Sequence, residues 1–116
     1  MKKKTILIAE DEPVIALDYR VFFEKRGYET IVLQSATEVI KSIRKKKPDF
    51  GLVDIRLFKD GNAGIRIGTE LQNLNIPFVF ISGFPDPMVY EEAIKLKPVH
   101  IFLKPVNLHN VHGHII

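Results

Sequence analysis

Short apolar runs alternate along the chain with segments in which apolar residues recur at helical spacing. The runs cover residues 5–9, 29–33, 50–54, 78–82 and 99–103. Their richness in β-branched and aromatic residues predicts five buried strands. The segments between them predict helices, and residues 107–116 predict a fifth, short helix at the end of the chain. The apolar residues that indicate the first four helices are Val14, Leu17 and Val21; Val39, Ile40 and Ile43; Ile67, Leu71 and Leu74; and, more weakly, Val89, Ala93 and Ile94.

Residues with special backbone preferences support this division. Pro13 suits the first turn of a helix and Gly27 the end of one. Ser35 and Glu38 have the spacing of a capping box at the start of the second helix. Five strands that alternate with helices predict an α/β fold with a single doubly wound, five-stranded parallel sheet flanked by five helices. With 116 residues and no linker or internal repeat, residues 1–116 are expected to form one domain.

The composition is that of an ordinary globular protein, with 46% hydrophobic and 27% charged residues. The chain has no cysteine, which excludes disulfides, thiolate nucleophiles and thiolate metal sites. Lysines at positions 2–4 precede an apolar stretch, as in a signal peptide, but that stretch ends before Glu10 and is too short for an h-region. No apolar run approaches the length of a membrane span. We therefore expect a cytoplasmic protein without a membrane partner.

The formal net charge of +3 comes partly from two basic clusters, at positions 2–4 and 44–47. No aromatic residue lies among these lysines, as a platform for stacking nucleobases would require. The clusters are interpreted as a solvated strand start and as a helix C-terminus, where cations complement the helix dipole. Direct nucleic-acid binding is not expected.

Polar residues stand at the C-terminal ends of four apolar runs. In an open parallel sheet these ends line the crevice in which ligands bind, so we expect the side chains to meet there. Three carboxylates, a hydroxyl and an amine in one place predict a site for a divalent cation and a phosphoryl group. Oxygen donors without histidine or cysteine favour Mg²⁺. The residues are Glu10 and Asp11 after the first run, Asp54 in the third, Ser82 in the fourth and Lys104 after the fifth.

Asp54 is the candidate nucleophile of this site. A carboxylate can attack a phosphoryl group to give an aspartyl phosphate. Such a transfer needs mainly positioning and neutralisation of the phosphoryl oxygens, which Lys104 and Ser82 could supply together with Mg²⁺. Helix-dipole complementarity alone would explain one acid close to Pro13. It would not explain Asp54, which ends an apolar strand.

These motifs resemble those of the response-regulator receiver domain, the CheY-like phosphoacceptor module of two-component signalling and phosphorelays. The resemblance runs over essentially the whole chain and rests on residues 8–13, 52–55, 81–83 and 103–105. It implies the flavodoxin-like strand order 2-1-3-4-5. It also implies a regulatory domain that is no enzyme beyond its own phosphorylation and dephosphorylation. The implied phosphoryl donor is a phosphohistidine on a sensor histidine kinase or a histidine phosphotransfer protein.

The resemblance assigns roles within the site. It implies that Asp54 is phosphorylated and that Asp11 and Asp54 contact Mg²⁺ directly, while Glu10 acts mainly through a bound water. The backbone carbonyl of Arg56 would be a further metal ligand. The Lys104–Pro105 peptide would be cis. The surface that meets an unknown downstream effector would include the fourth helix, the fifth strand and the fifth helix.

The chain departs from the receiver pattern at Ile101, where receivers commonly carry the tyrosine or phenylalanine of an aromatic switch. Phe102 should face the opposite side of the strand and not substitute for it. Phe84 is a candidate for the readout instead, and Arg56 and Phe84 are expected to influence the lifetime of the phosphorylated form. The glycines of the loop at residues 56–64 suit turn positions with positive φ.

Two other functions are alternatives to phosphoacceptor signalling. A receiver fold that acts as an interaction module without phosphorylation is the main alternative. A flavodoxin-like cofactor binder would need a glycine-rich phosphate loop where this chain has acidic residues. His109, His112 and His114 suggest a metal site, but the segment is terminal and has no carboxylate partner, so a polar, partly exposed helix is the preferred interpretation.

Overall fold

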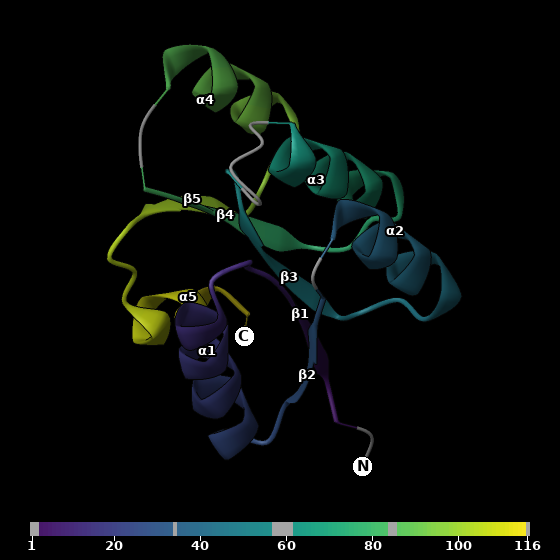
Figure 1. The fold of residues 1–116 in the computed structure, drawn as a ribbon, viewed down its shortest axis with the longest axis vertical. Helices are drawn as coiled ribbons and strands as arrows, with labels where there is room; N and C mark the ends of the chain where they lie inside the picture. Colours follow the sequence, from purple (N-terminus) through teal and green to yellow (C-terminus); the bar gives the residue numbers. More distant parts are fainter. Residues whose placement is uncertain (1–2, 34, 57–61, 84–85, 116) are drawn as a thin grey trace.

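The computed structural model describes residues 3–33, 35–56, 62–83 and 86–115. Strands and helices alternate along the described chain without exception (Figure 1). No helix in this part of the chain is long and apolar enough to cross a membrane. The elements are β1 (Thr5–Ala9), α1 (Pro13–Lys25), β2 (Glu29–Val32), α2 (Ala36–Lys45), β3 (Phe50–Asp54), α3 (Ala63–Asn73), β4 (Phe78–Ser82), α4 (Pro87–Lys95), β5 (His100–Leu103) and α5 (Leu108–Ile115).

The five strands form one parallel sheet in the order β2-β1-β3-β4-β5. This is the predicted fold class and the strand order that the resemblance implied. The register pairs Ala9 with Val53 and Ser82 with Leu103, so that neighbouring strands end at nearly the same level. The two edge strands are each one residue shorter than the apolar runs that predicted them, as is common where an element ends.

Helices cover both faces of the sheet. Figure 1 shows α1 and α5 together on one face and α2, α3 and α4 on the other. Successive residues of β1 enter opposite layers: Ile6 and Ile8 pack towards α1 and α5, whereas Leu7 and Ala9 pack towards the other helices. Every residue of the inner strands β1, β3 and β4 is buried, as expected for a parallel sheet covered on both faces.

The predicted helix boundaries have visible local causes. Pro13 is the first residue of α1, and Gly27 follows that helix with a φ of +89°, a conformation that glycine adopts without strain. The Ser35 hydroxyl accepts a hydrogen bond of 3.2 Å from the backbone N–H of Glu38. This bond caps α2 as the spacing predicted.

The apolar residues that predicted α1 do not face the core. Val14 is 80% exposed, Leu17 58% and Val21 41%, and we call these three residues the α1 stripe. The buried side of the helix consists of Ala16, Tyr19 and Phe23 instead. Both sets have helical spacing, so periodicity identified the helix without identifying its buried face.

Candidate functional site

Glu10, Asp11 and Asp54 form an acidic pocket at the C-terminal ends of β1 and β3. Each contributes a carboxylate oxygen, and these oxygens all lie within 4.8 Å of one another. Glu10 and Asp54 are buried, and Asp11 is half-buried. The register of β1 with β3 brings the pocket together, because the strand ends of a parallel sheet share one edge.

Lys104 reaches the acidic pocket from the end of β5. Its Nζ donates hydrogen bonds to Asp54 Oδ2 at 2.9 Å and to Glu10 Oε1 at 3.3 Å. The backbone N–H of Lys104 donates to the carbonyl oxygen of Ser82 at 2.8 Å, which joins the ends of β4 and β5. The Lys104–Pro105 peptide is cis, as the resemblance implied.

Backbone groups orient the two buried carboxylates. The second oxygen of Asp54 accepts a hydrogen bond of 3.0 Å from the backbone N–H of Arg56. The second oxygen of Glu10 accepts one of 3.2 Å from the N–H of Glu12. Each carboxylate is thus held between Lys104 on one oxygen and its own loop on the other.

Burial and charge shape the protonation of this cluster. Burial raises the pKa of Glu10 and the charge of Asp54 adds to the rise, against the lowering effects of the Glu12 N–H and of Lys104. Burial alone would lower the pKa of Lys104, but the hydrogen bonds and charges of Asp54 and Glu10 outweigh it, so the pKa lies above its ordinary value. Burial, assisted by the charge of Glu10, raises the pKa of Tyr19 to about 12.

The acidic pocket fits a hard divalent cation. Its three carboxylates offer oxygen donors only, and the single positive charge of Lys104 does not balance their negative charge. Burial is the main cause of the raised pKa of Glu10, and a divalent cation would offset the smaller contribution from the charge of Asp54. The donor set therefore matches the predicted Mg²⁺ site.

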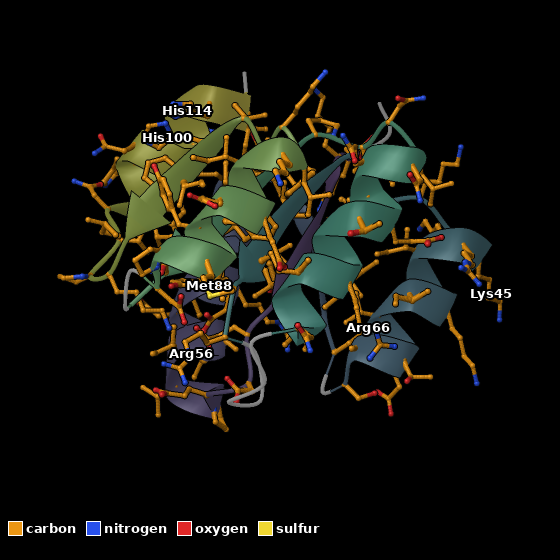
Figure 2. The ribbon with its side chains drawn as sticks, turned by 90° about the horizontal axis from the view of Figure 1, so that it is seen from above. Lys45, Arg56, Arg66, Met88, His100 and His114 are labelled. Carbon is orange, nitrogen blue, oxygen red and sulfur yellow. The ribbon has the colours of Figure 1, made fainter. Side chains whose placement is uncertain are left out.

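Ser82 and Arg56 lie at the carboxyl ends of β4 and β3. Ser82 is buried at the end of β4 and pairs in register with Leu103, directly before Lys104. Arg56 follows the end of β3, and its side chain, labelled in Figure 2, is exposed. Phe84, like residues 57–61 of the loop, lies outside the described residues, so its proposed part in the readout stays a prediction.

Ile101 and Phe102 face opposite sides of β5, as predicted from strand geometry. Ile101 packs against the core layer of α2, α3 and α4, whereas Phe102 packs against the layer of α1 and α5. Phe102 therefore does not take the place of the aromatic residue that receivers commonly carry at position 101. Ile101 instead lines an apolar groove between α4 and β5, together with Pro87, Tyr90 and Leu103.

Gly64 is a site residue whose role the sequence did not reveal. It was expected at a turn with positive φ, but it lies in the first turn of α3 without such a φ. A Cβ atom at this position would lie 2.5 Å from the carbonyl oxygen of Ile55 and would also overlap that of Asp54. The glycine is needed because α3 begins against the backbone that carries Asp54.

Comparisons with known proteins agree with this geometry. The family model described as the response regulator receiver domain matches residues 6–116. The phyllosphere-induced regulator PhyR of Methylorubrum extorquens is 34% identical over 109 residues, which are 91% of this chain and 40% of PhyR. The sporulation initiation phosphotransferase F of Bacillus subtilis is 24% identical over 113 residues, which are 96% of this chain and 90% of that protein.

Solved structures share the fold. The signal receiver domain of a modulated diguanylate cyclase from Desulfovibrio desulfuricans superimposes with a TM-score of 0.87 at 27% identity, covering 98% of this chain and 91% of that one. A CheY-like receiver domain from Methanospirillum hungatei gives a TM-score of 0.88 at 22% identity, over 98% of this chain and 91% of that one.

The chain spans less than half of two relatives, 40% of PhyR and 45% of nodulation protein W of Bradyrhizobium diazoefficiens. The matched part is in each case the length of one domain. Since the family model covers nearly all of the chain and the acidic pocket and Lys104 lie together at the strand ends, this chain belongs to the response regulator receiver domains, the phosphoacceptor signalling domains of two-component systems.

Proposed function

We propose that this domain accepts a phosphoryl group on Asp54 in an Mg²⁺-dependent reaction and thereby switches a partner-binding surface. The observation that carries the proposal is the contact of 2.9 Å between Lys104 Nζ and Asp54 Oδ2 inside the acidic pocket. It places a fixed positive charge beside the carboxylate that would bear the incoming group. Receiver domains interact with histidine kinases or phosphotransfer proteins and with effectors, and this chain supplies the phosphoacceptor chemistry for such a pair.

Glu10, Asp11 and Asp54, with the backbone carbonyl of Arg56 added by family likeness, would hold the Mg²⁺ ion. The ion would supply neutralisation of negative charge during the transfer. The carboxylates are already oriented by Lys104 and by the N–H groups of the two loops. Little reorganisation of these side chains would therefore be needed at the moment of reaction.

The transfer itself exchanges one bond of phosphorus for another. A carboxylate oxygen of Asp54 attacks the phosphorus of a phosphohistidine, and the P–N bond breaks with its electron pair remaining on the imidazole nitrogen. The ammonium group of Lys104 would neutralise charge on the phosphoryl oxygens, and the Ser82 hydroxyl would donate a hydrogen bond to one of them. Their positions at the ends of neighbouring strands favour this division of roles.

The α1 stripe gives the phosphoryl donor a place to bind. The helix starts two residues after Asp11, so its exposed apolar residues begin beside the acidic pocket. A sensor histidine kinase or histidine phosphotransfer protein must approach this end of the sheet for its phosphohistidine to reach Asp54. The exposed apolar surface of Val14, Leu17 and Val21 would be buried in that complex.

The surface that responds would include α4, β5 and α5. Ser82 and Lys104 connect the acidic pocket to β4 and β5 through their backbone hydrogen bond. Several large apolar side chains are exposed on or near α4 and β5 and could meet an effector: Met88, Tyr90, Ile94, Val99 and Leu103. Phosphorylation would bias an existing equilibrium between two arrangements of this surface.

Incubation with acetyl phosphate and Mg²⁺ tests the function. We expect the intact mass to increase by one phosphoryl group, and we expect no increase when Mg²⁺ is removed with a chelator. Asp54→Ala should abolish the increase, whereas Asp18→Ala, an exposed aspartate of α1, should leave it unchanged. A wild-type protein that gains no phosphoryl group would favour the alternative function, an interaction module independent of phosphorylation.

Leu17→Glu tests the proposed donor surface. It should leave phosphorylation by acetyl phosphate unchanged, because Leu17 is 58% exposed and belongs to the α1 stripe outside the acidic pocket. It should slow transfer from a phosphorylated histidine kinase that labels the wild-type chain, by about tenfold or more for a side chain near the centre of an interface. Ile94→Glu is the matched control, since Ile94 is 50% exposed but lies on α4. Equal slowing in both variants would count against the α1 stripe.

A further inference from the structure

Two histidines from different elements lie together away from the acidic pocket. His100 opens β5 and His114 stands in the last turn of α5, and their ring centroids are 5.0 Å apart with an angle of 32° between the planes. Figure 2 shows the two labelled side chains next to each other at the edge of the sheet. Both residues are exposed. We call them the histidine pair.

The surroundings of the histidine pair fix its rings. The ring of Phe102 packs edge-on against that of His114, with centroids 5.3 Å apart. The ring centroids of Phe102 and His100 are 4.5 Å apart. The Nδ1 atom of His114 lies 2.8 Å from the backbone carbonyl oxygen of Asn110. Because a carbonyl oxygen only accepts, Nδ1 carries the hydrogen and Nε2 of the neutral ring keeps its lone pair.

The contact of His114 with the Asn110 carbonyl oxygen is of a kind found at metal-binding histidines. A metal-binding histidine usually donates its other ring N–H to a backbone carbonyl or carboxylate, which fixes the tautomer and orients the ring. A cation at this place would also be favoured by the helix dipole, because His114 lies at the C-terminal end of α5. Imidazole nitrogen suits zinc, copper and nickel and does not suit Mg²⁺.

We propose that His100 and His114 bind a divalent transition metal ion of the zinc, nickel and copper group, in a site that links β5 to α5. Within the described residues no carboxylate joins the pair in a cluster of three potential ligands, so water would complete the coordination. The site is independent of the proposed phosphorylation chemistry, since its nitrogen donors differ in kind from the oxygen donors of the acidic pocket. It would make the link between two elements of the expected effector surface depend on metal.

The other two histidines provide a contrast on the same helix. The Nε2 atom of His112 lies 3.0 Å from the hydroxyl oxygen of Tyr28, so this ring faces β2 and α1. His109 packs edge-on against Phe22 of α1 with centroids 5.1 Å apart. The spacing of His109 and His112 suggested a pair in the sequence, but the structure pairs His114 with His100 of β5.

Zinc titration of the full chain tests the site. Isothermal titration calorimetry in excess Mg²⁺, which would occupy the acidic pocket, should show one Zn²⁺ ion per chain. His100→Gln and His114→Gln should each weaken binding at least as much as loss of an outer-sphere partner does, about 10- to 100-fold. His109→Gln is the matched control and should bind like the wild type. Nitrogen-15 NMR of the imidazole rings should show Zn²⁺ shifting the signals of His100 and His114 and leaving His109 in place.

Two results would overturn the proposal. Equal Zn²⁺ affinity in all three glutamine variants would place the ion elsewhere. A stoichiometry of one ion for two chains would show that separate surface histidines bridge molecules. Acetyl phosphate labelling of the same variants keeps this test separate from the proposed function, because phosphorylation of Asp54 should proceed in His100→Gln whether or not the metal site exists.

Discussion

Lys104→Met is expected to slow phosphorylation by acetyl phosphate by about 10²- to 10³-fold, the usual effect of removing one charge-stabilising donor from a transition state. It should also destabilise the metal-free protein at neutral pH. Lys104 bridges Asp54 and Glu10, whose side chains are 9% and 2% exposed. Without the ammonium group, two buried carboxylates repel each other. Since Lys104 itself is 26% exposed, we expect a loss of about 2–3 kcal/mol, below that of a fully buried pair.

The destabilisation by Lys104→Met should shrink as the pH falls. Burial already raises the pKa of Glu10 and Lys104 lowers it, so removal of Lys104 raises that pKa further above its ordinary value of 4.5. Between 4.5 and this raised value the folded state binds more protons than the unfolded state, so a lower pH favours folding. Saturating Mg²⁺ should likewise restore stability by compensating the same charge.

Urea denaturation of Lys104→Met, with and without Mg²⁺ and over a pH series, measures these effects. The control is Lys41→Met, at an exposed lysine of α2, which should leave both the free energy of unfolding and the phosphorylation rate nearly unchanged. A variant as stable as the wild type at neutral pH would show that Lys104 does not compensate the acidic pocket. Unchanged phosphorylation would remove it from the proposed transfer.

Much of the fold could be predicted from the pattern of apolar residues alone. In a parallel α/β fold the buried strands are apolar runs, and the helices that cover them have apolar residues at helical spacing. The same topology explains why the sequence was enough to predict that Glu10, Asp54 and Lys104 lie close together. They end strands of one parallel sheet, and such ends share an edge. Strand alternation was likewise enough to place Ile101 and Phe102 on opposite faces.

What the sequence could not supply depends on contacts between elements. The α1 helix carries two apolar series, and only packing decides that Tyr19 is buried while Leu17 is exposed. The sequence does not connect His100 with the other histidines, because its nearness to His114 depends on how α5 lies against β5. Gly64 resembled a turn residue, since close backbone approach leaves no periodic signal in the sequence.

Gly64→Ala is expected to destabilise the protein by about 3 kcal/mol, the upper part of the range for inserting a methyl group where there is no room. The added Cβ would lie 2.5 Å from the Ile55 carbonyl oxygen and 2.7 Å from the Ile55 Cα, and would overlap the carbonyl oxygen of Asp54. These are backbone atoms, so no side-chain rotation relieves the clash. Either α3 or the end of β3 must move, and with it the carboxylate of Asp54. Phosphorylation by acetyl phosphate should therefore be slower even among folded molecules.

Gly113→Ala separates this clash from the general effect of replacing glycine in a helix. Gly113 also lies within a helix, α5, but a Cβ there would meet nothing within 4 Å. Alanine should stabilise that position by about 0.5–1 kcal/mol, because it loses less conformational freedom on folding. In urea denaturation the free energy of unfolding should thus decrease for Gly64→Ala and increase for Gly113→Ala. Phosphorylation should slow only in Gly64→Ala. If both variants gained stability, α3 would not begin against the backbone of Asp54 as closely as the structure places it.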